Sequence, residues 1–246
     1  MKNLILILLI TISFQLSAQK KITFKSSDGL GITADLYISN SEDSPLIVLF
    51  HQAGWSRGEY KEIAPKLNTL GYNCIAVDQR SGGEINSVVN GTHQRAKEQK
   101  KGTQYSDAEI DLLAAIKYAK SNYPKAKKLI IWGSSYSSSL VLKIAGDGRV
   151  EVDAVVSFAP GEYFERMGKP ADYIGQSAKN IIVPTFITSA KSEKNNWWSI
   201  YKSIPAIGKD YYLPKTDGQH GSRALWEKFS DHKGYWLAVE AFLKTI

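Results

Sequence analysis

The sequence predicts an α/β fold built on a doubly wound, mostly parallel sheet. From Pro45 onward, apolar segments of strand length alternate with segments whose apolar residues recur at helical spacing. Segments such as 46–50 and 129–132 are apolar at every position, which is typical of parallel strands buried on both faces. Ligands bind such sheets beyond the carboxyl ends of the strands, so we expect the functional residues in the loops there.

The chain divides into a short N-terminal segment and one domain. Residues 1–18 contain one early lysine, an apolar run and the small pair Ser17 and Ala18, a pattern typical of a secretory signal peptide cleaved after Ala18. The apolar run is shorter than the roughly 20 residues of a membrane span, so we expect no stable membrane anchor after cleavage. Residues 19–246 suffice for one α/β-domain, secreted or periplasmic.

Composition argues against several classes of partner and cofactor. The net charge of +7 is spread along the chain, and its one dense basic run, residues 97–101, is typical of a solvated loop rather than a nucleic-acid site. The single cysteine, Cys74, lies in an apolar segment and is assigned to packing. Histidine, cysteine and acidic residues show no metal-ligand spacing, so we expect neither a metal nor an organic cofactor.

The first elements form the edge of the predicted sheet. Segments 21–25 and 32–38 flank an Asp-Gly turn and predict an antiparallel hairpin. The strand 46–50 then ends in a loop containing His51 and Gly54. A helical pattern follows over residues 60–70, where Pro65 either kinks the helix or begins a second segment.

The remaining elements alternate in the same way. The strand at 73–78 precedes about 20 polar residues without clear period, which we interpret as a binding loop or lid spanning residues 81–105. Ser106 and Glu109 predict a capping box at the start of the next helix. Further strands are predicted at 129–133, 154–161, 181–190 and 210–214, with an insertion at 162–180, a Trp-rich helix and a closing helix.

Ser135 lies between a buried strand and the start of a helix. This is the position of the serine in the nucleophile elbow, G-x-S-x-G, where a sharp turn exposes the side chain at the end of the sheet. Gly133 fits the first glycine, whereas Ser137 stands in place of the last. An ordinary strand-to-helix connection with a serine cap is the alternative.

A nucleophilic serine needs a base and an acid. His220 lies in a glycine-flanked loop between the last predicted strand and the closing helix, where it could reach the elbow. Glu193 is the first acid after the strand 181–190 and is favoured to orient the imidazole, with Asp217 as the competitor.

Ser135, Glu193 and His220, in that chain order, together with the loop His51–Gly54 make the chain similar to the α/β-hydrolase superfamily, in particular to its dienelactone-hydrolase-like members. The resemblance implies an oxyanion hole formed by the backbone N–H groups of Tyr136 and Ala53, with Gln52 as the near alternative to Ala53. Ser137 in place of glycine and glutamate in place of the commoner aspartate are the two departures.

These residues predict a serine hydrolase that cleaves small carboxylic esters through an acyl-enzyme. A hydrolase-fold protein that binds a ligand without turnover is the alternative. Four residues in the loops are predicted to contact substrate: Gln52, Trp55, Tyr163 and Trp197. Because the insertion 162–180 is too short for a large cap, we expect a preference for acetyl to butyryl esters over long acyl chains.

Overall fold

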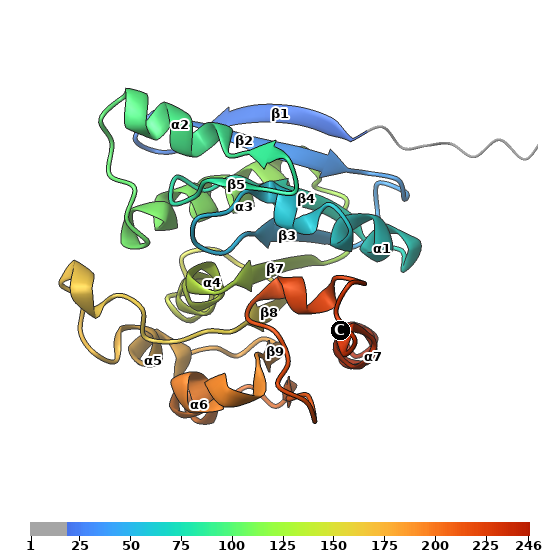
Figure 1. The fold of residues 1–246 in the computed structure, drawn as a ribbon. Helices are drawn as coiled ribbons and strands as arrows, with labels where there is room; N and C mark the ends of the chain where they lie inside the picture. Colours follow the sequence, from blue (N-terminus) through green and yellow to red (C-terminus); the bar gives the residue numbers. More distant parts are fainter. Residues whose placement is uncertain (1–18) are drawn as a thin grey trace, which may run out of the picture.

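The computed structural model describes residues 19–246, so the predicted signal peptide and its cleavage site lie outside the described residues. Within this range the chain forms one sheet in the order β1-β2-β4-β3-β7-β8-β9-β10 (Figure 1). The strands are β1 (Lys20–Lys25), β2 (Gly31–Tyr37), β3 (Leu46–Phe50), β4 (Asn73–Val77), β7 (Leu129–Ser134), β8 (Ala154–Phe158), β9 (Thr185–Thr188) and β10 (Lys209–Tyr212).

The sheet is mixed only at its N-terminal edge. Strand β1 pairs antiparallel with β2, and β2 pairs antiparallel with β4, whereas the strands from β4 to β10 are all parallel. Gly29 takes a positive φ of 83° in the β1–β2 turn, a conformation that glycine adopts without strain. The predicted α/β fold with an N-terminal antiparallel hairpin is therefore confirmed.

Helices cover both faces of the sheet. On one face lie α1 (Ile63–Thr69) and α7 (His232–Leu243), and on the other lie α3 (Glu109–Asn122), α4 (Tyr136–Gly146), α5 (Tyr173–Ala178) and α6 (Lys194–Ser203). Figure 1 shows α1 and α7 together on the right, away from α4, α5 and α6. Because strand side chains alternate, Leu49 joins the core beside α1 and α7, and Val48 and Phe50 join the other.

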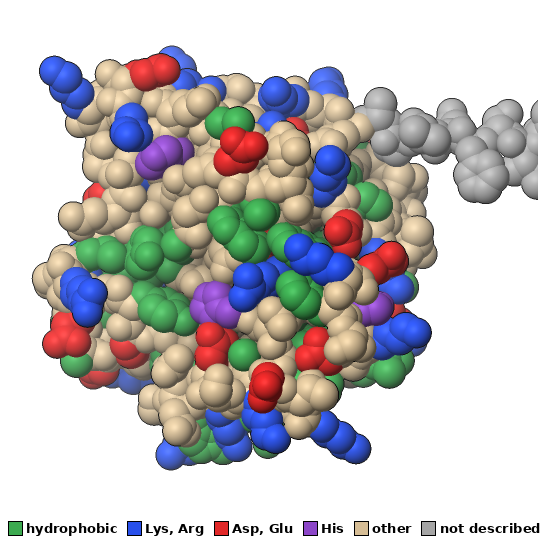
Figure 2. Space-filling view, in the orientation of Figure 1, with side chains coloured by type: hydrophobic (Ala, Val, Ile, Leu, Met, Phe, Trp, Pro, Cys, Tyr) green, Lys and Arg blue, Asp and Glu red, His purple; other side chains and the backbone are tan. Residues whose placement is uncertain are grey.

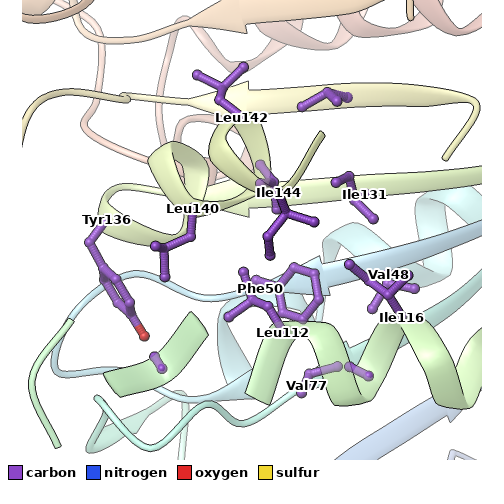
Figure 3. Close-up of a cluster of buried hydrophobic side chains, with 14 of the residues drawn as sticks. Val48, Phe50, Val77, Leu112, Ile116, Ile131, Tyr136, Leu140, Leu142 and Ile144 are labelled. Atoms are coloured by element: carbon purple, nitrogen blue, oxygen red, sulfur yellow. The ribbon is translucent and has the colours of Figure 1, made fainter. Parts of the chain in front are cut away.

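The core beneath α3 and α4 holds the carboxyl ends of β3, β4 and β7, where the loops of the candidate site begin. Figure 3 shows Phe50 among Leu112 of α3 and Leu140 and Ile144 of α4. In the sheet, Phe50 pairs with Val77 on one side and with Gly133 on the other. The loops after β3, β4 and β7 therefore leave the sheet at the same level and converge on one edge.

The polar stretch after β4 is more ordered than the sequence predicts. It contains the short hairpin β5 (Glu84–Ile85) and β6 (Val88–Val89) and the helix α2 (Gly91–Glu98). The side chain of Asn90 caps α2 by accepting the N–H of His93 at 2.7 Å. The buried residues of α2 are Thr92 and Ala96, too few to give the segment a recognisable apolar period.

The structure tests two predictions about where helices begin, one at Ser106 and one at Pro65. The capping box at Ser106 is wrong, because residues Ser106–Ala108 form a 3₁₀ turn and α3 begins at Glu109 without a side-chain cap. Pro65 is the third residue of α1, after a separate 3₁₀ turn η1 (Arg57–Tyr60). A proline in the first helical turn removes no intrahelical hydrogen bond, so it begins a second segment rather than kinking the first. Among the helices of residues 19–246, none is long and apolar enough to cross a membrane.

Candidate active site

Ser135 occupies a strained turn between β7 and α4. Its φ of 58° and ψ of −126° lie in a region that non-glycine residues rarely adopt. Its N–H donates to the carbonyl of Phe158 at 2.7 Å, which ties the elbow to the end of β8. A Cβ on Gly133 would lie 2.4 Å from the carbonyl oxygen of Ser137, so helix α4 can recross β7 only over a glycine. This is the geometry of a nucleophile elbow.

Ser137, the departure from the motif, is part of the same structure. The residue is fully buried, and its hydroxyl lies 2.7 Å from the carbonyl oxygen of Phe50 and 2.9 Å from that of His51. The same hydroxyl accepts the N–H of Ser134 at 3.0 Å. A serine at this position therefore joins the end of β3 to the elbow, a link that glycine could not make.

The predicted base and acid meet above the sheet edge. His220 Nδ1 lies 2.5 Å from Oε1 of Glu193, which ends the 3₁₀ turn η4 (Lys191–Glu193) after β9. Both side chains are partly exposed, His220 by 29% and Glu193 by 22%. The competitor Asp217 is exposed, and it contributes its backbone carbonyl to the N–H of Lys191 at 2.8 Å. The acid paired with His220 in the described residues is thus Glu193.

The nucleophile candidate has a tyrosine beside it. Tyr163 donates its hydroxyl to the carbonyl of Ala159 at 2.8 Å. Burial raises the pKa of Tyr163, and a hydrogen bond with the side chain of Ser135 lowers it in part. In the described part of the chain, the Ser135 hydroxyl and the His220 ring form no hydrogen bond with each other. Hydrogen bonds between a catalytic serine and histidine commonly tighten only when substrate is bound.

Two backbone N–H groups are candidates for an oxyanion hole. Within residues 19–246, the N–H groups of Ala53 and Tyr136 have no hydrogen-bond acceptor. The N–H of Gln52 donates to Oε2 of Glu59 at 2.8 Å and is therefore not available to a substrate. Of the two alternatives weighed from the sequence, the geometry favours Ala53.

His51 is a neutral, fully buried imidazole that supports the loop of residues 51–54, named the oxyanion loop after its candidate donor Ala53. Its Nε2 accepts the N–H of Gln79 at 3.1 Å, so its proton lies on Nδ1, which donates to the carbonyl of Gln52 at 2.7 Å. Asn90 adds a contact from its side-chain nitrogen to Nε2 at 3.0 Å. Burial lowers the pKa of His51 to about 4, so the ring stays uncharged near neutral pH.

A buried acid that sequence reasoning missed lies beneath these loops. Glu59, in η1, has no exposed surface, and it accepts hydrogen bonds from Gln52 and from the hydroxyl of Ser134 at 2.6 Å. Burial raises its pKa to about 7, although these hydrogen bonds and the charges of His220 and Arg223 oppose the rise. In the sequence Glu59 is one acid in a polar loop, and nothing marks it as buried.

Arg223 is the second residue that sequence reasoning missed. Its guanidinium lies 5.9 Å from the ring centre of Trp55, whose indole stacks on Trp226. In the described part of the chain, its Nε is a buried side-chain nitrogen without a hydrogen-bond partner. Buried side-chain nitrogens normally have a partner, so the unpaired Nε is an exception in this part of the chain. Figure 2 shows histidine, acidic and basic side chains close together on the lower half of this face.

The predicted substrate contacts divide into surface and core residues. Trp55 and Tyr163 keep part of their surface exposed, and Gln52 keeps 7%. The assignment of Trp197 is wrong, because its side chain has no exposed surface and its indole N–H donates to the hydroxyl of Ser189 at 2.7 Å. Trp197 packs in the core between α6 and the sheet and stabilises the loop after β9.

Other candidates for chemistry in the described residues are structural. Cys74 is buried in β4, and burial raises the pKa of its thiol, which disfavours the reactive thiolate. Residues 19–246 contain no group of three or more histidine, cysteine or acidic side chains placed to hold a metal ion.

The fold and the elbow place the chain in the α/β-hydrolase class, and comparisons with known proteins agree. The family model described as "Serine aminopeptidase, S33" matches residues 41–197, and the chain belongs to this family of hydrolases. The thiohydrolase apmlB of Arthrinium phaeospermum is 29% identical over 159 residues, which are 63% of this chain and 48% of that protein. The chain thus spans about half the length of this curated relative.

Solved structures of similar fold include three groups of hydrolases. The esterase Pf2001 of Pyrococcus furiosus has a TM-score of 0.71 and 20% identity, with 92% of each chain covered. A dienelactone hydrolase from Anabaena variabilis has a TM-score of 0.70 and 12% identity, covering 92% of this chain and 97% of that one. Est1E from Butyrivibrio proteoclasticus, solved with ferulic acid, has a TM-score of 0.67 and 15% identity, covering 91% and 98%. At these identities the likeness establishes the fold, and it bears out the dienelactone-hydrolase-like resemblance.

Proposed function

We propose that the protein is a secreted or periplasmic serine hydrolase that cleaves small carboxylic esters through an acyl-enzyme. One observation carries this proposal: the strained Ser135 and the hydrogen-bonded pair of His220 and Glu193 lie on loops that leave the same edge of the sheet. A serine in such a turn is held at a cost in backbone strain, which is typical of residues that act in catalysis.

The residues divide the reaction between them as follows. Ser135 Oγ bonds to the acyl carbon while its proton passes to Nε2 of His220, and Glu193 holds the Nδ1 proton and stabilises the imidazolium. The tetrahedral oxyanion accepts hydrogen bonds from the N–H groups of Ala53 and Tyr136. His220 then protonates the leaving alcohol, and water repeats the sequence to release the acid and restore the serine.

The substrate is proposed to be a short acyl ester. Trp55 and Tyr163 border the site, and the insertion after β8 contributes only the 3₁₀ turn η3 (Glu165–Met167) and the six-residue helix α5. Such short elements offer little surface for a long acyl chain, and each enclosed methylene contributes about 0.8 kcal/mol only while it is buried. The positive charge of Arg223, which lies beside Trp55, favours esters that also carry an anionic group. Thioesters, cleaved by the same residues, are the nearest alternative, as the name of the apmlB thiohydrolase suggests.

The test combines an activated-serine probe with a series of esters. We expect a fluorophosphonate to label the wild type but not Ser135→Ala, and we expect kcat/KM for p-nitrophenyl esters to be highest between acetate and butyrate. Ser121→Ala is the matched control, because Ser121 is an exposed serine of α3 and its loss should leave labelling at Ser135 unchanged. Absence of labelling in the folded wild type would favour ligand binding without turnover. A rate that rises to decanoate would contradict the short-acyl proposal.

A further inference from the structure

The carboxyl group of Glu59 lies at the junction of three loops that form the site. Its Oε2 accepts the N–H of Gln52, the residue before Ala53, at 2.8 Å. Its Oε1 accepts the hydroxyl of Ser134, the residue before Ser135, at 2.6 Å. The side chain thus contacts both the oxyanion loop and the elbow, each at the residue next to a proposed catalytic group.

The third loop reaches Glu59 through Ser134. The hydroxyl of Ser134 accepts the N–H of Ser222 at 2.9 Å, and Ser222 follows His220 by two residues. Between them, Gly221 lies so close that a Cβ would be 2.5 Å from the Ser134 hydroxyl. The loop that carries His220, named the histidine loop, is therefore packed against the Ser134 hydroxyl, which donates to Glu59. A displacement of Glu59 would therefore displace all three loops.

Glu59 is a buried acid that lacks an ion-pair partner. Within residues 19–246, its carboxylate has no lysine, arginine or histidine nitrogen within 4.0 Å. The charged groups that act on it are His220 and Arg223 from the loop packed above it, and the ionisable group beside it in η1 is Tyr60, whose pKa burial and Glu59 raise. Arg57 of η1 is already paired with Asp35 and Asp78. Burial of a carboxylate without an ion-pair partner lowers the stability of the chain. Such a cost indicates that Glu59 has a role at the site.

We infer that Glu59 is a positioning residue for the proposed hydrolysis: it holds the oxyanion loop, the elbow and the histidine loop in register, and its negative charge favours the His220 imidazolium of the transition state. This inference rests on the proposed function. The ordering of the loops follows from the two hydrogen bonds. The electrostatic part follows from linkage, because the interaction by which a charged His220 favours ionised Glu59 acts equally in the other direction.

The wild-type enzyme itself provides the first test, through the pH dependence of kcat/KM for p-nitrophenyl acetate. Protonation of His220 alone gives an acid limb with a slope of 1 on a logarithmic plot. If ionised Glu59 is also needed, two protons suppress the rate, and the slope exceeds 1 over the pH range in which Glu59 takes up its proton. A wild-type slope of 1 overturns the inference without any variant, and it leaves the proposed function intact.

The variant Glu59→Gln supplies the second test, since it keeps the size of the side chain but removes its charge. We expect kcat at pH 8 to fall on the order of tenfold with KM little changed, and the acid limb to return to a slope of 1. Glu62→Gln is the matched control, because Glu62 is exposed and lies three residues further along. A Glu59→Gln enzyme with wild-type kcat and slope overturns the inference. Fluorophosphonate labelling of the wild type, measured in parallel, separates this result from a failure of the proposed function.

Discussion

Replacing Glu59 by glutamine should change how stability depends on pH, and the size of the change follows from burial. The pKa of Glu59 is raised from 4.5 to about 7 in the folded chain. The native state therefore keeps a proton that the unfolded chain has lost between these values, and stability falls as pH rises through that window. At 1.36 kcal/mol for each pKa unit, the loss is about 3 kcal/mol. The stabilisation is fully present below pH 4.5 and gone above about pH 7.

His51 acts in the opposite direction over nearly the same range. Its pKa is lowered from 6.5 to about 4, so its contribution is fully present above pH 6.5 and is lost as pH falls toward 4. This loss is also about 3 kcal/mol. Between pH 4.5 and 6.5 the two groups change the free energy of unfolding of the wild type in opposite directions, and their effects largely cancel. In Glu59→Gln only the pH dependence due to His51 remains.

Urea unfolding followed by tryptophan fluorescence measures this difference, since the chain has six tryptophans. The free energy of unfolding of Glu59→Gln, relative to wild type, should rise by about 3 kcal/mol between pH 4.5 and pH 7.5. The contributions of all other titratable groups to the free energy of unfolding are the same in both proteins and cancel in this comparison. A difference that stays constant with pH would refute the argument, because it would mean that Glu59 titrates alike in the folded and unfolded chains.

Two further predictions concern the acid and the N-terminus. Glu193→Gln should reduce kcat by about three orders of magnitude, because an amide cannot stabilise the imidazolium, whereas Asp217→Asn should have little effect on ester hydrolysis; equal losses in the two variants would remove Glu193 from the proposed triad. Mass measurement of the exported protein should give a chain that begins at Gln19, and a mature protein that retains Met1 would contradict the proposed signal peptide.

Much of the fold could be predicted because the buried strands carry their own signal. Strands β3, β4 and β8 are buried along their whole length, and their predominantly apolar sequences mark them without reference to the rest of the chain. Helix α2 carries no such signal, since it is held by the cap from Asn90 and by two small buried residues. Its existence depends on contacts with β2, which the local sequence does not reveal.

The candidate site was predictable to the extent that chain order determines it. Ser135 is marked by its neighbours, and Glu193 and His220 by the strands that they follow. Trp197 and Trp198 could not be told apart in this way, because adjacent residues on a helix face different directions, and only the fold shows that Trp197 is the one in the core.

Glu59 marks the limit of this reasoning. Its partner Ser134 lies 75 residues away in sequence, and Ser134 reaches Ser222 across a further 88. In sequence each is an ordinary polar residue, and a surface position is the usual place for a glutamate. What gives Glu59 its raised pKa is the convergence of β3, β7 and the histidine loop at one edge of the sheet. A buried charge without an ion-pair partner is costly. The contacts of Glu59 with two of the loops, and through Ser134 with the third, connect the stability of the chain to the arrangement of its proposed catalytic groups.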